Sequence, residues 1–404
     1  MRIIFSVHGY KPAYRVGGPI ISVSSLAEKL SSKGHEVAVF TTNSNLDEDL
    51  DVPLACPVDV QGVEVWYFKR IEVLKKLLPF VPYLSNSSGY VYAPTMRIEL
   101  RKRIESVDLV HTHLPFIYPT LVAATYARKF QKPLFYHQRG VFDPQRLNFR
   151  SVKKRAYIRY LELPILRNAT TLIALTDAEV ESYRALGVDT PCRVIPNGVD
   201  VTSYRPHPIN PIPYIPDHSN VILFLGRIHP IKGADVLLEA FVSIASQFPN
   251  AVLVLAGPDE FNLEKKFRAL AESAGFGERV IFPGMVSGDQ KLDLIARADL
   301  FCLPSMGEGF SMAVLEALAS CTAVLLSPGC HFDEVSNAGC GVVAHPTKDA
   351  LASALAQLLA QPEKLKAMGD LGYQLVREKY SWDTIADQMI DAYAEGLERH
   401  GSRR

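Results

Sequence analysis

The sequence predicts an α/β protein of two doubly wound domains, each a parallel sheet with helices on both faces. The chain has 404 residues, more than one ordinary domain holds, and suits two domains of about 150–200 residues. Both halves alternate short apolar runs with helical patterns, and such runs are typical of strands buried on both faces. A proline-rich stretch separates the halves. Together these observations predict the architecture.

In the first half, apolar runs rich in β-branched residues predict strands. The first, 2–7, leads through a glycine-containing loop to a helical pattern over 20–33. The others are 36–42, 63–68, 108–111, 134–137 and 171–175, with a further helical pattern at 116–129. This half, 1–205, is the predicted N-terminal domain.

The second half repeats the same alternation. Its predicted strands are 221–226, 251–257, 279–283, 299–303 and 322–327, and its predicted helices are 234–246, 263–274, 289–298 and 312–319. Prolines 206, 208, 211, 213 and 216 mark 206–217 as a semi-rigid linker. The second domain is therefore expected over 218–381. A final helix, 382–400, could pack back on the first domain or on the second.

Composition excludes several classes of protein. Lysine plus arginine and aspartate plus glutamate both count 43, and this zero formal charge argues against a nucleic-acid partner. The six cysteines form no CxxC pair and no zinc spacing, so no metal site is expected. We expect the cysteines to be free thiols in a reducing compartment. No basic-then-apolar leader and no run of 18 apolar residues is present. The expectation is a cytoplasmic protein.

A glycine pair follows the first predicted strand. Gly17 and Gly18 precede Pro19, which suits the first position of a helix. Glycines let backbone amides approach a ligand closely, and a helix N-terminus favours an anion. A plain glycine turn is the alternative. The absence of GxGxxG disfavours a dinucleotide site.

Two cations follow the first strand of the second half. Arg227 and Lys232 lie five residues apart in the run 226–233, which begins and ends with glycine. A guanidinium can chelate phosphate oxygens through two hydrogen bonds, and a lysine adds a point charge. The spacing therefore suits a diphosphate, and a solvated turn is the alternative.

Two carboxylates follow the strand predicted at 299–303. Glu308 lies between Gly307 and Gly309. The next helix begins just after it, and the backbone amides of Phe310, Ser311 and Met312 at its N-terminus would point at an anion. Glu316 lies within that helix among apolar neighbours, so its ionised carboxylate needs partners there. A ribose diol would supply two hydroxyl donors. Glu308 could accept hydrogen bonds from sugar hydroxyls in the same way.

These elements resemble the retaining glycosyltransferases of family 4, also called group 1, which have the GT-B fold of two Rossmann-like domains. The likeness covers almost the whole chain, in the right order. The matching elements are Gly17-Gly18, Asp108-Leu109-Val110-His111-Thr112-His113, Ile195-Pro196-Asn197-Gly198-Val199-Asp200, Gly226-Arg227 with Lys232-Gly233, and Glu308 with Glu316.

The resemblance implies a nucleotide-sugar donor, a UDP- or GDP-sugar, in the cleft between the domains. By resemblance, Arg227 and Lys232 hold its diphosphate, and Glu316 holds its ribose. Glu308 and the amides of residues 309–312 (Gly309, Phe310, Ser311, Met312) hold the sugar. The base lies near Met285-Val286, and Gly17-Gly18 contacts phosphate or sugar. Neither a metal nor a cofactor is implied, because cations and helix N-termini neutralise the diphosphate.

One loop departs from the usual family pattern. Members often carry a histidine or arginine before a glycine after the strand at 134–137, and here the sequence is His137-Gln138-Arg139-Gly140. By resemblance, Arg139 takes that role against donor sugar or phosphate. The implied catalytic set is thus Glu308, Arg227, Lys232 and Arg139. His137 is a further candidate or a core histidine, and His111 and His113 are interpreted as structural polar groups.

The implied chemistry follows from charge. The diphosphate gains negative charge as the glycosidic bond breaks, and Arg227, Lys232 and a helix N-terminus would stabilise it in the transition state. Retention implies attack from the face of departure, with the leaving phosphate as base. The implied acceptor is a glycan or a lipid-linked glycan, in polysaccharide or cell-envelope synthesis.

Two segments of the first half mix basic and apolar residues. They are 69–84 and 146–167, and the second holds seven basic residues against one acidic residue. Such segments can lie on an anionic membrane surface, which would make the protein peripheral at the cytoplasmic face. A helix with a solvated basic face is the alternative.

Other functions remain open from sequence. Another GT-B enzyme, such as a nucleotide-sugar epimerase, would consume donor without acceptor and release an isomer. A phosphorylase would carry a pyridoxal-phosphate lysine, which the sequence does not identify. A hinge-closing binding protein would bind ligand and turn nothing over. The oligomeric state is not predicted.

Overall fold

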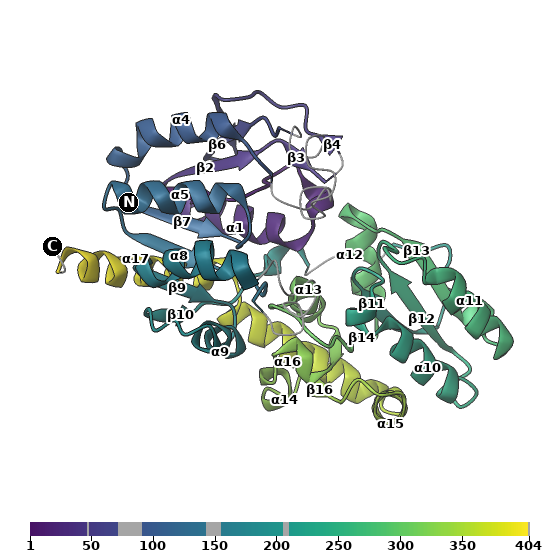
Figure 1. The fold of residues 1–404 in the computed structure, drawn as a ribbon. Coiled ribbons are helices and arrows are strands. Elements are labelled where there is room, and N and C mark those ends of the chain that lie inside the picture. The colour runs from purple at the N-terminus through teal and green to yellow at the C-terminus, as the bar shows by residue number, and fades with distance from the viewer. Residues whose placement is uncertain (47, 72–90, 143–154, 205–209, 403–404) are drawn as a thin grey trace. The chain divides into compact units, whose positions relative to one another are not determined.

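The computed structural model describes residues 1–46, 48–71, 91–142, 155–204 and 210–402 (Figure 1). Contacts divide the chain into two units. The first is Met1–Asn197 together with Trp382–Arg404, and the second is Gly198–Ser381. Each is a parallel sheet with flanking helices, which confirms the predicted fold class. No helix in the described ranges is long and apolar enough to cross a bilayer.

The sheet of the first unit has the order β10-β9-β8-β7-β1-β2-β6-β5 over its described residues. The strands are β1 (Arg2–Ser6), β2 (Glu36–Thr42), β5 (Pro57–Val60), β6 (Val63–Phe68), β7 (Leu109–His113), β8 (Leu134–His137), β9 (Thr171–Ala174) and β10 (Cys192–Val194). All pairs are parallel except β5 with β6. Strand order reverses between β1 and β7, so the loops after these two strands leave the sheet at the position where such sheets bind ligands.

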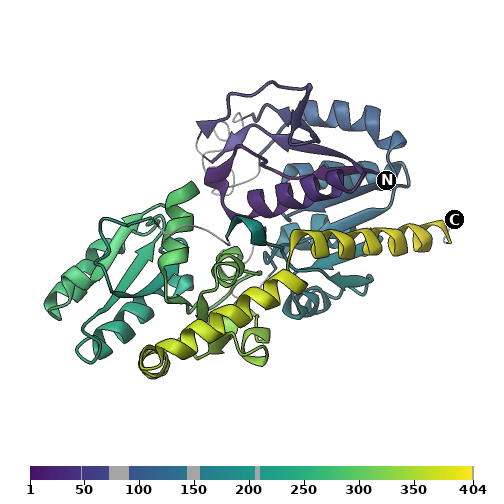
Figure 2. The same cartoon turned by 180° about the vertical axis from the view of Figure 1, so that it is seen from behind.

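Helices cover both faces of this sheet. They are α1 (Gly18–Ser32), α4 (Pro94–Arg103), α5 (Tyr118–Lys129), α8 (Leu163–Asn168), α9 (Asp177–Ala185) and α17 (Trp382–Gly401). Figure 1 has α5 and α8 nearest the viewer, and Figure 2, seen from behind, has α1 and α17 nearest. Residues Ser44–Asn45 and Glu48–Asp49 form a separate two-stranded ladder, β3 with β4.

The second sheet has the order β13-β12-β11-β14-β15-β16 and is parallel throughout its described length. Its strands are β11 (Asn220–Leu225), β12 (Ala251–Ala256), β13 (Val280–Gly284), β14 (Leu300–Leu303), β15 (Ala323–Leu326) and β16 (Gly341–Val343). Its helices are α10 (Ala234–Ile244), α11 (Glu264–Ser273), α12 (Gly288–Arg297), α13 (Met312–Ala319), α14 (Glu334–Asn337), α15 (Lys348–Leu359) and α16 (Pro362–Lys379). Order reverses between β11 and β14, so the loops carrying Arg227 and Glu308 leave neighbouring strands.

The boundary between the units differs from the predicted one. The chain crosses at Asn197/Gly198, not in the linker expected at 206–217, whose described part, 210–217, belongs to the second unit. Asn197 accepts a hydrogen bond from Arg139 of the first unit, whereas Val199 donates to the Tyr380 carbonyl of the second. Prolines mark an irregular backbone, but the boundary depends on contacts made by residues far away in sequence.

The C-terminal helix belongs to the first unit. In α17, Asp383 pairs with Lys29 of α1, and Asp387 pairs with Lys33, the residue that follows α1. Deeper in the helix, the Tyr393 hydroxyl lies 2.7 Å from His111 Nδ1 on β7. Surface ion pairs of this kind contribute little, so the buried face of α17 supplies most of the attachment.

Candidate functional site

The two loops that carry the predicted donor residues in the second unit are joined to each other. Gly233 ends the loop after β11 with φ +72°, and a Cβ there would lie 2.3 Å from the Pro304 carbonyl oxygen. The Met306 amide donates to the Ile231 carbonyl at 2.8 Å. Only glycine permits this approach, so Gly233 sets the distance between the loops.

Lys232 and Glu308 meet across this junction. Lys232 Nζ lies 2.5 Å from Glu308 Oε1, and their side chains are only 16% and 6% exposed. The Glu308 amide donates to the Gly329 carbonyl, which fixes the loop beneath the carboxylate. An ammonium and a carboxylate are thus held together at the carboxyl ends of β11 and β14, where both residues were predicted to bind the donor.

Arg227 lies at the end of β11 with a half-exposed side chain. Its Nη1 donates to both oxygens of Glu260, at 3.1 and 2.9 Å. Sequence analysis did not identify Glu260, because it lies 33 residues further along, outside any recognised motif. Arg227 thus follows β11, the strand after which it was expected. Its charge is paired with the exposed carboxylate of Glu260.

Glu316 is the fifth residue of α13 and is 4% exposed. Lys291 Nζ of α12 donates to its Oε1 at 2.7 Å. The Tyr204 hydroxyl also hydrogen-bonds to this carboxylate, and burial together with the charge of Glu316 raises the pKa of Tyr204. The partners expected for a buried carboxylate are therefore Lys291 and Tyr204, neither of which sequence reasoning named.

The remaining residues predicted to bind the donor substrate differ in whether their backbone amides or their side chains are accessible. Ser311 precedes α13, so the amides that follow it form the first turn of the helix, which lacks intrahelical acceptors. The Phe310 ring instead packs on Phe332 and Tyr380, which gives its side chain a structural role. Val286 is buried and its neighbour Met285 is exposed. They follow β13, two strands from β11.

In the first unit, the Gly17-Gly18 pair begins α1 beside the reversal of strand order. Gly17 has φ +98°, and a Cβ added at either glycine would contact nothing within 4 Å. Glycine at position 17 is therefore required by the backbone, and the space above both residues is open. Pro19 lies in the first turn of α1, as predicted.

Arg139 is a buried cation of the first unit, 8% exposed, in the loop after β8. It donates to His113, Ser22 and Asn197. Burial lowers the pKa of Arg139 to about 10, and the charge of Glu179 opposes this effect. Even at that pKa the guanidinium is charged at neutral pH. Because its three hydrogen-bond acceptors are neutral and Glu179 offsets the cost of burial only in part, an anionic ligand would stabilise this cation further.

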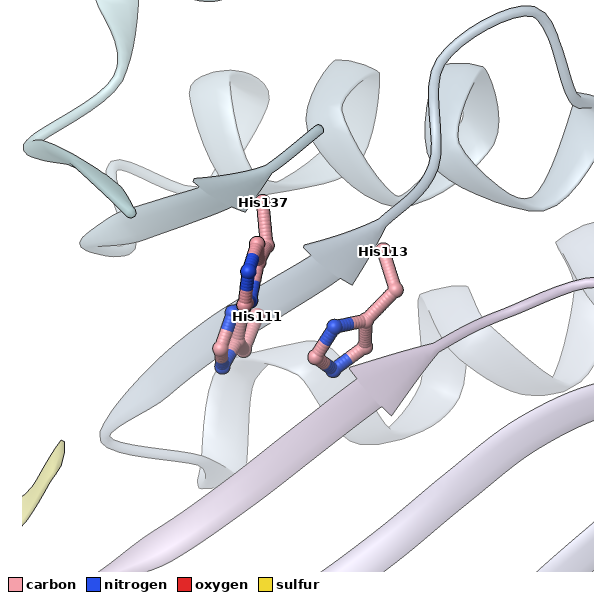
Figure 3. A group of neighbouring side chains, drawn as sticks. All are labelled: His111, His113 and His137. Atoms are coloured by element: carbon pink, nitrogen blue, oxygen red, sulfur yellow. The ribbon is translucent and has the colours of Figure 1, made fainter. Parts of the chain in front are cut away.

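The side chains of His111, His113 and His137 gather on β7 and β8 (Figure 3), and His113 accepts the hydrogen bond from Arg139. One nitrogen from each ring can be chosen so that the three lie within 4.8 Å of one another. All three are buried, and burial followed by the positive charge of Arg139 or a neighbouring histidine lowers their pKa values well below the usual range. They are therefore neutral at physiological pH.

The site can thus present cations and hydrogen-bond acceptors to a charged ligand. In the second unit Lys232, Lys291 and Arg227 each pair with a carboxylate, Glu308, Glu316 and Glu260 respectively. A diphosphate could replace a carboxylate as partner of a cation, and a diol could donate to a carboxylate.

The model "Glycosyltransferase Family 4" matches residues 16–203, and "Glycosyl transferases group 1" matches residues 209–375. A D-inositol 3-phosphate glycosyltransferase of Gordonia bronchialis is 26% identical, over 96% of this chain and 86% of that protein.

Two solved structures share the fold. HepE of Anabaena, in complex with UDP and glucose, has a TM-score of 0.72 at 18% identity, covering 98% of this chain and 100% of that one. A sucrose-phosphate synthase of Thermosynechococcus elongatus has a TM-score of 0.70 at 22% identity, covering 98% of each chain. These likenesses extend over both units.

Proposed function

This chain belongs to the family 4 (group 1) glycosyltransferases and is a glycosyltransferase of the GT-B fold, and we propose that it is a retaining enzyme. The proposed reaction moves a sugar from a UDP- or GDP-sugar to a glycan or lipid-linked glycan, in polysaccharide or cell-envelope synthesis. HepE was solved with UDP-glucose bound, which supports a nucleotide-sugar donor. The zero net charge of the chain speaks against nucleic acid as a partner.

One observation carries the proposal. The loops after β11 and β14 pack closely where Gly233 meets the Pro304 carbonyl, and this contact places Lys232 against Glu308. Arg227 leaves the same strand as Lys232, and Glu316 follows Glu308 into α13. Cations for a diphosphate and carboxylates for hydroxyl groups thus converge at one reversal of strand order, the place where open α/β sheets bind ligands.

The proposed mechanism uses these groups in turn. Lys232 and Arg227 exchange their carboxylate partners for phosphate oxygens and stabilise the charge that grows on the leaving diphosphate. Glu308, released from Lys232, accepts hydrogen bonds from the donor sugar, and Glu316 accepts them from the ribose. Leaving phosphate takes the proton of the acceptor hydroxyl. We propose that no metal or cofactor takes part, since two cations and the first turn of α13 supply the neutralising charge.

The donor class and the metal-free site can be tested by thermal unfolding. UDP, GDP, ADP and CDP are added separately, with and without EDTA. UDP or GDP is expected to raise the melting temperature, because a ligand at about 100 times its Kd stabilises a protein by about 2.7 kcal/mol. EDTA should leave the shift unchanged. A shift that EDTA abolishes would contradict the metal-free proposal.

We further propose that the first unit acts at an anionic membrane surface on the cytoplasmic face, where a lipid-linked acceptor would lie. Segment 69–84 and residues 146–154 fall mainly or wholly outside the described residues. The described part of the second segment exposes Tyr160 (72%) and Leu161 between Arg155, Arg159 and Arg167. An exposed aromatic ring among arginines suits the interface of an anionic bilayer.

Co-sedimentation with vesicles tests the membrane proposal. Wild type is expected to sediment with vesicles containing anionic lipid at low salt, and to be released as salt rises, because surface charge is screened. The variant Tyr160→Ser/Arg159→Glu should sediment less. Arg377→Glu, an exposed charge change in the second unit, serves as the matched control. Equal sedimentation of all three proteins would refute a role for this surface.

A further inference from the structure

The three buried histidines lie on one face of the first sheet. His111 and His113 are two residues apart on β7, and His113 stands opposite His137 of β8 in the parallel register. Their ring centroids are 4.1 Å apart for His111 and His113, and 5.7 Å apart for His113 and His137. Figure 3 shows the rings gathered near the carboxyl ends of the two strands. This places them beneath the loop that carries Arg139.

Arg139 makes three side-chain hydrogen bonds, one of them to this cluster. Its Nε lies 3.3 Å from His113 Nδ1, and its Nη1 lies 2.8 Å from Ser22 Oγ and 3.0 Å from Asn197 Oδ1. The three acceptors come from β7, from α1 and from the end of the first unit's N-terminal segment. Arg139 also has φ +53°, a conformation that costs energy for a residue with a side chain. Several segments thus cooperate to fix one strained, buried cation.

The hydrogen bond to Arg139 determines the tautomer of His113. A guanidinium nitrogen can only donate, so Nδ1 of His113 must accept, and the ring proton must be on Nε2. Burial, followed by the charges of His111, Arg139 and His137, keeps the pKa of His113 far below neutrality. His113 is therefore an acceptor under physiological conditions.

The same tautomer argues against a metal ion between the histidines. A metal ligand must offer a bare ring nitrogen, whereas His113 Nε2 carries hydrogen and Nδ1 is used by Arg139. A cation bound there would also be repelled by the charge of Arg139, which adds to burial in lowering the pKa values of all three histidines. Proximity of the rings alone would suit a metal, but the tautomer and the charge of Arg139 do not.

We propose that His113 is a positioning residue that, with Ser22 and Asn197, aims the Arg139 guanidinium at an anionic group of the nucleotide-sugar donor. This inference rests on the proposed function. The three hydrogen-bond acceptors of Arg139 are neutral, and the charge of Glu179 offsets only part of the cost of burying the guanidinium. The guanidinium gains a partner when a phosphate arrives, and its fixed orientation then requires no rearrangement at the moment of reaction. His111, bonded to Tyr393, and His137 fill the space beneath without adding charge.

The test compares two replacements of His113 in the full-length enzyme. His113→Leu removes the acceptor, whereas His113→Asn keeps an oxygen near the position of Nδ1. His113→Leu should lower kcat by about 100-fold, the loss expected when a catalytic group is misplaced by an ångström. KM for the donor should change less. His113→Asn should recover most of kcat. Equal impairment of both variants would overturn the proposal.

A matched control separates positioning from packing. His111→Leu removes a buried imidazole from the same strand but leaves all three hydrogen bonds of Arg139 intact. It should lower the melting temperature about as much as His113→Leu without the loss of kcat. Equal kcat losses in the two variants would make the role of His113 structural. Should His113→Leu not fold, Ser22→Ala must still show a several-fold loss of kcat, and an unchanged kcat there would refute the network.

Two further measurements identify other outcomes. Added Co²⁺ should give no ligand-field absorption with wild type, and one equivalent bound in wild type but not in His113→Asn would make the cluster a metal centre. UDP and GDP binding is measured in parallel on wild type and each variant. Failure of wild type to bind either nucleotide would refute the proposed donor class. Normal nucleotide binding with the wrong pattern of kcat values would refute only the positioning role.

Discussion

Replacing Lys232 by alanine is expected to lower kcat by about 10²–10³-fold, the usual effect of removing one preorganised group that stabilises transition-state charge. KM for the donor should rise much less, because charge on the leaving diphosphate peaks in the transition state. Steady-state kinetics at saturating acceptor measure both quantities. An effect confined to KM would leave Lys232 as a residue for ground-state binding only.

The ion pair with Glu308 complicates this experiment and also supplies its control. Removing Lys232 strands a carboxylate that is 6% exposed, and an unpaired buried charge is destabilising in itself. The double variant Lys232→Ala/Glu308→Gln removes that stranded charge. We expect no recovery of kcat, since the cation for the diphosphate is still missing. Recovery would mean that Lys232 serves only to neutralise Glu308.

A surface ion pair of the same unit provides a second comparison. Lys379 pairs with Glu334 and has a largely exposed side chain. Lys379→Ala should leave kcat unchanged and should alter the melting temperature slightly, because exposed pairs contribute little. A similar loss of kcat in this variant would indicate a general defect rather than a role for Lys232.

The central strands were predictable because their chemistry is unambiguous. In β11, Val221, Ile222, Leu223 and Phe224 are fully buried, and such a continuous apolar run has few alternatives to a strand covered on both faces. The short edge strand β10 was missed. It has three residues, none of them buried, so neither its length nor its hydrophobicity distinguishes it from a loop. The edge strands β5 and β16 were missed as well, and so were the helices α14, α15 and α16 of the second unit.

Helix limits depended on backbone features that the periodicity does not show. The pattern at 116–129 predicts a helix from its first residue, whereas α5 begins at Tyr118. Leu114 and Phe116 have φ of +70° and +63°, a conformation that no helix contains. Pro119 then favours the first turn. The Phe116 amide in this turn donates to Glu162, a residue 46 positions further along the chain, and such a contact cannot be inferred from the local pattern.

The sequence predicted which loops carry the candidate site, but it did not predict which residues pair with the site residues. Residues after strand ends must lie at one edge of a parallel sheet, so the loops of Arg227 and Glu308 were expected at that edge. That β11 and β14 are neighbours is a property of strand order, which no local motif encodes. For the same reason the carboxylate of Glu260, the ammonium of Lys291 and the hydroxyl of Tyr204 could not be assigned. Each of these three residues belongs to a segment that is distant in sequence from the site residue it contacts.

Neutralising Glu316 is expected to weaken nucleotide binding by about 10–100-fold. A hydrogen bond to a charged group contributes about 1.5–3 kcal/mol, and about 1.4 kcal/mol corresponds to a tenfold change in Kd. Glu316→Gln keeps the size of the side chain and loses the charge that Lys291 and Tyr204 now share. Calorimetric titration with the nucleoside diphosphate that shifts wild type measures the change. Wild-type affinity in this variant would refute the ribose role.

The 2′-deoxy form of the same nucleotide makes this test specific for the ribose. If Glu316 accepts from the 2′-hydroxyl, wild type should bind the deoxy form more weakly, whereas Glu316→Gln should bind both forms almost equally. The two losses would then not add, which is the signature of groups in direct contact. Losing Glu316 also leaves Lys291 without its carboxylate, and that penalty acts on both nucleotides alike. Additive losses would therefore assign Glu316 to the support of α12 and α13 rather than to the ribose.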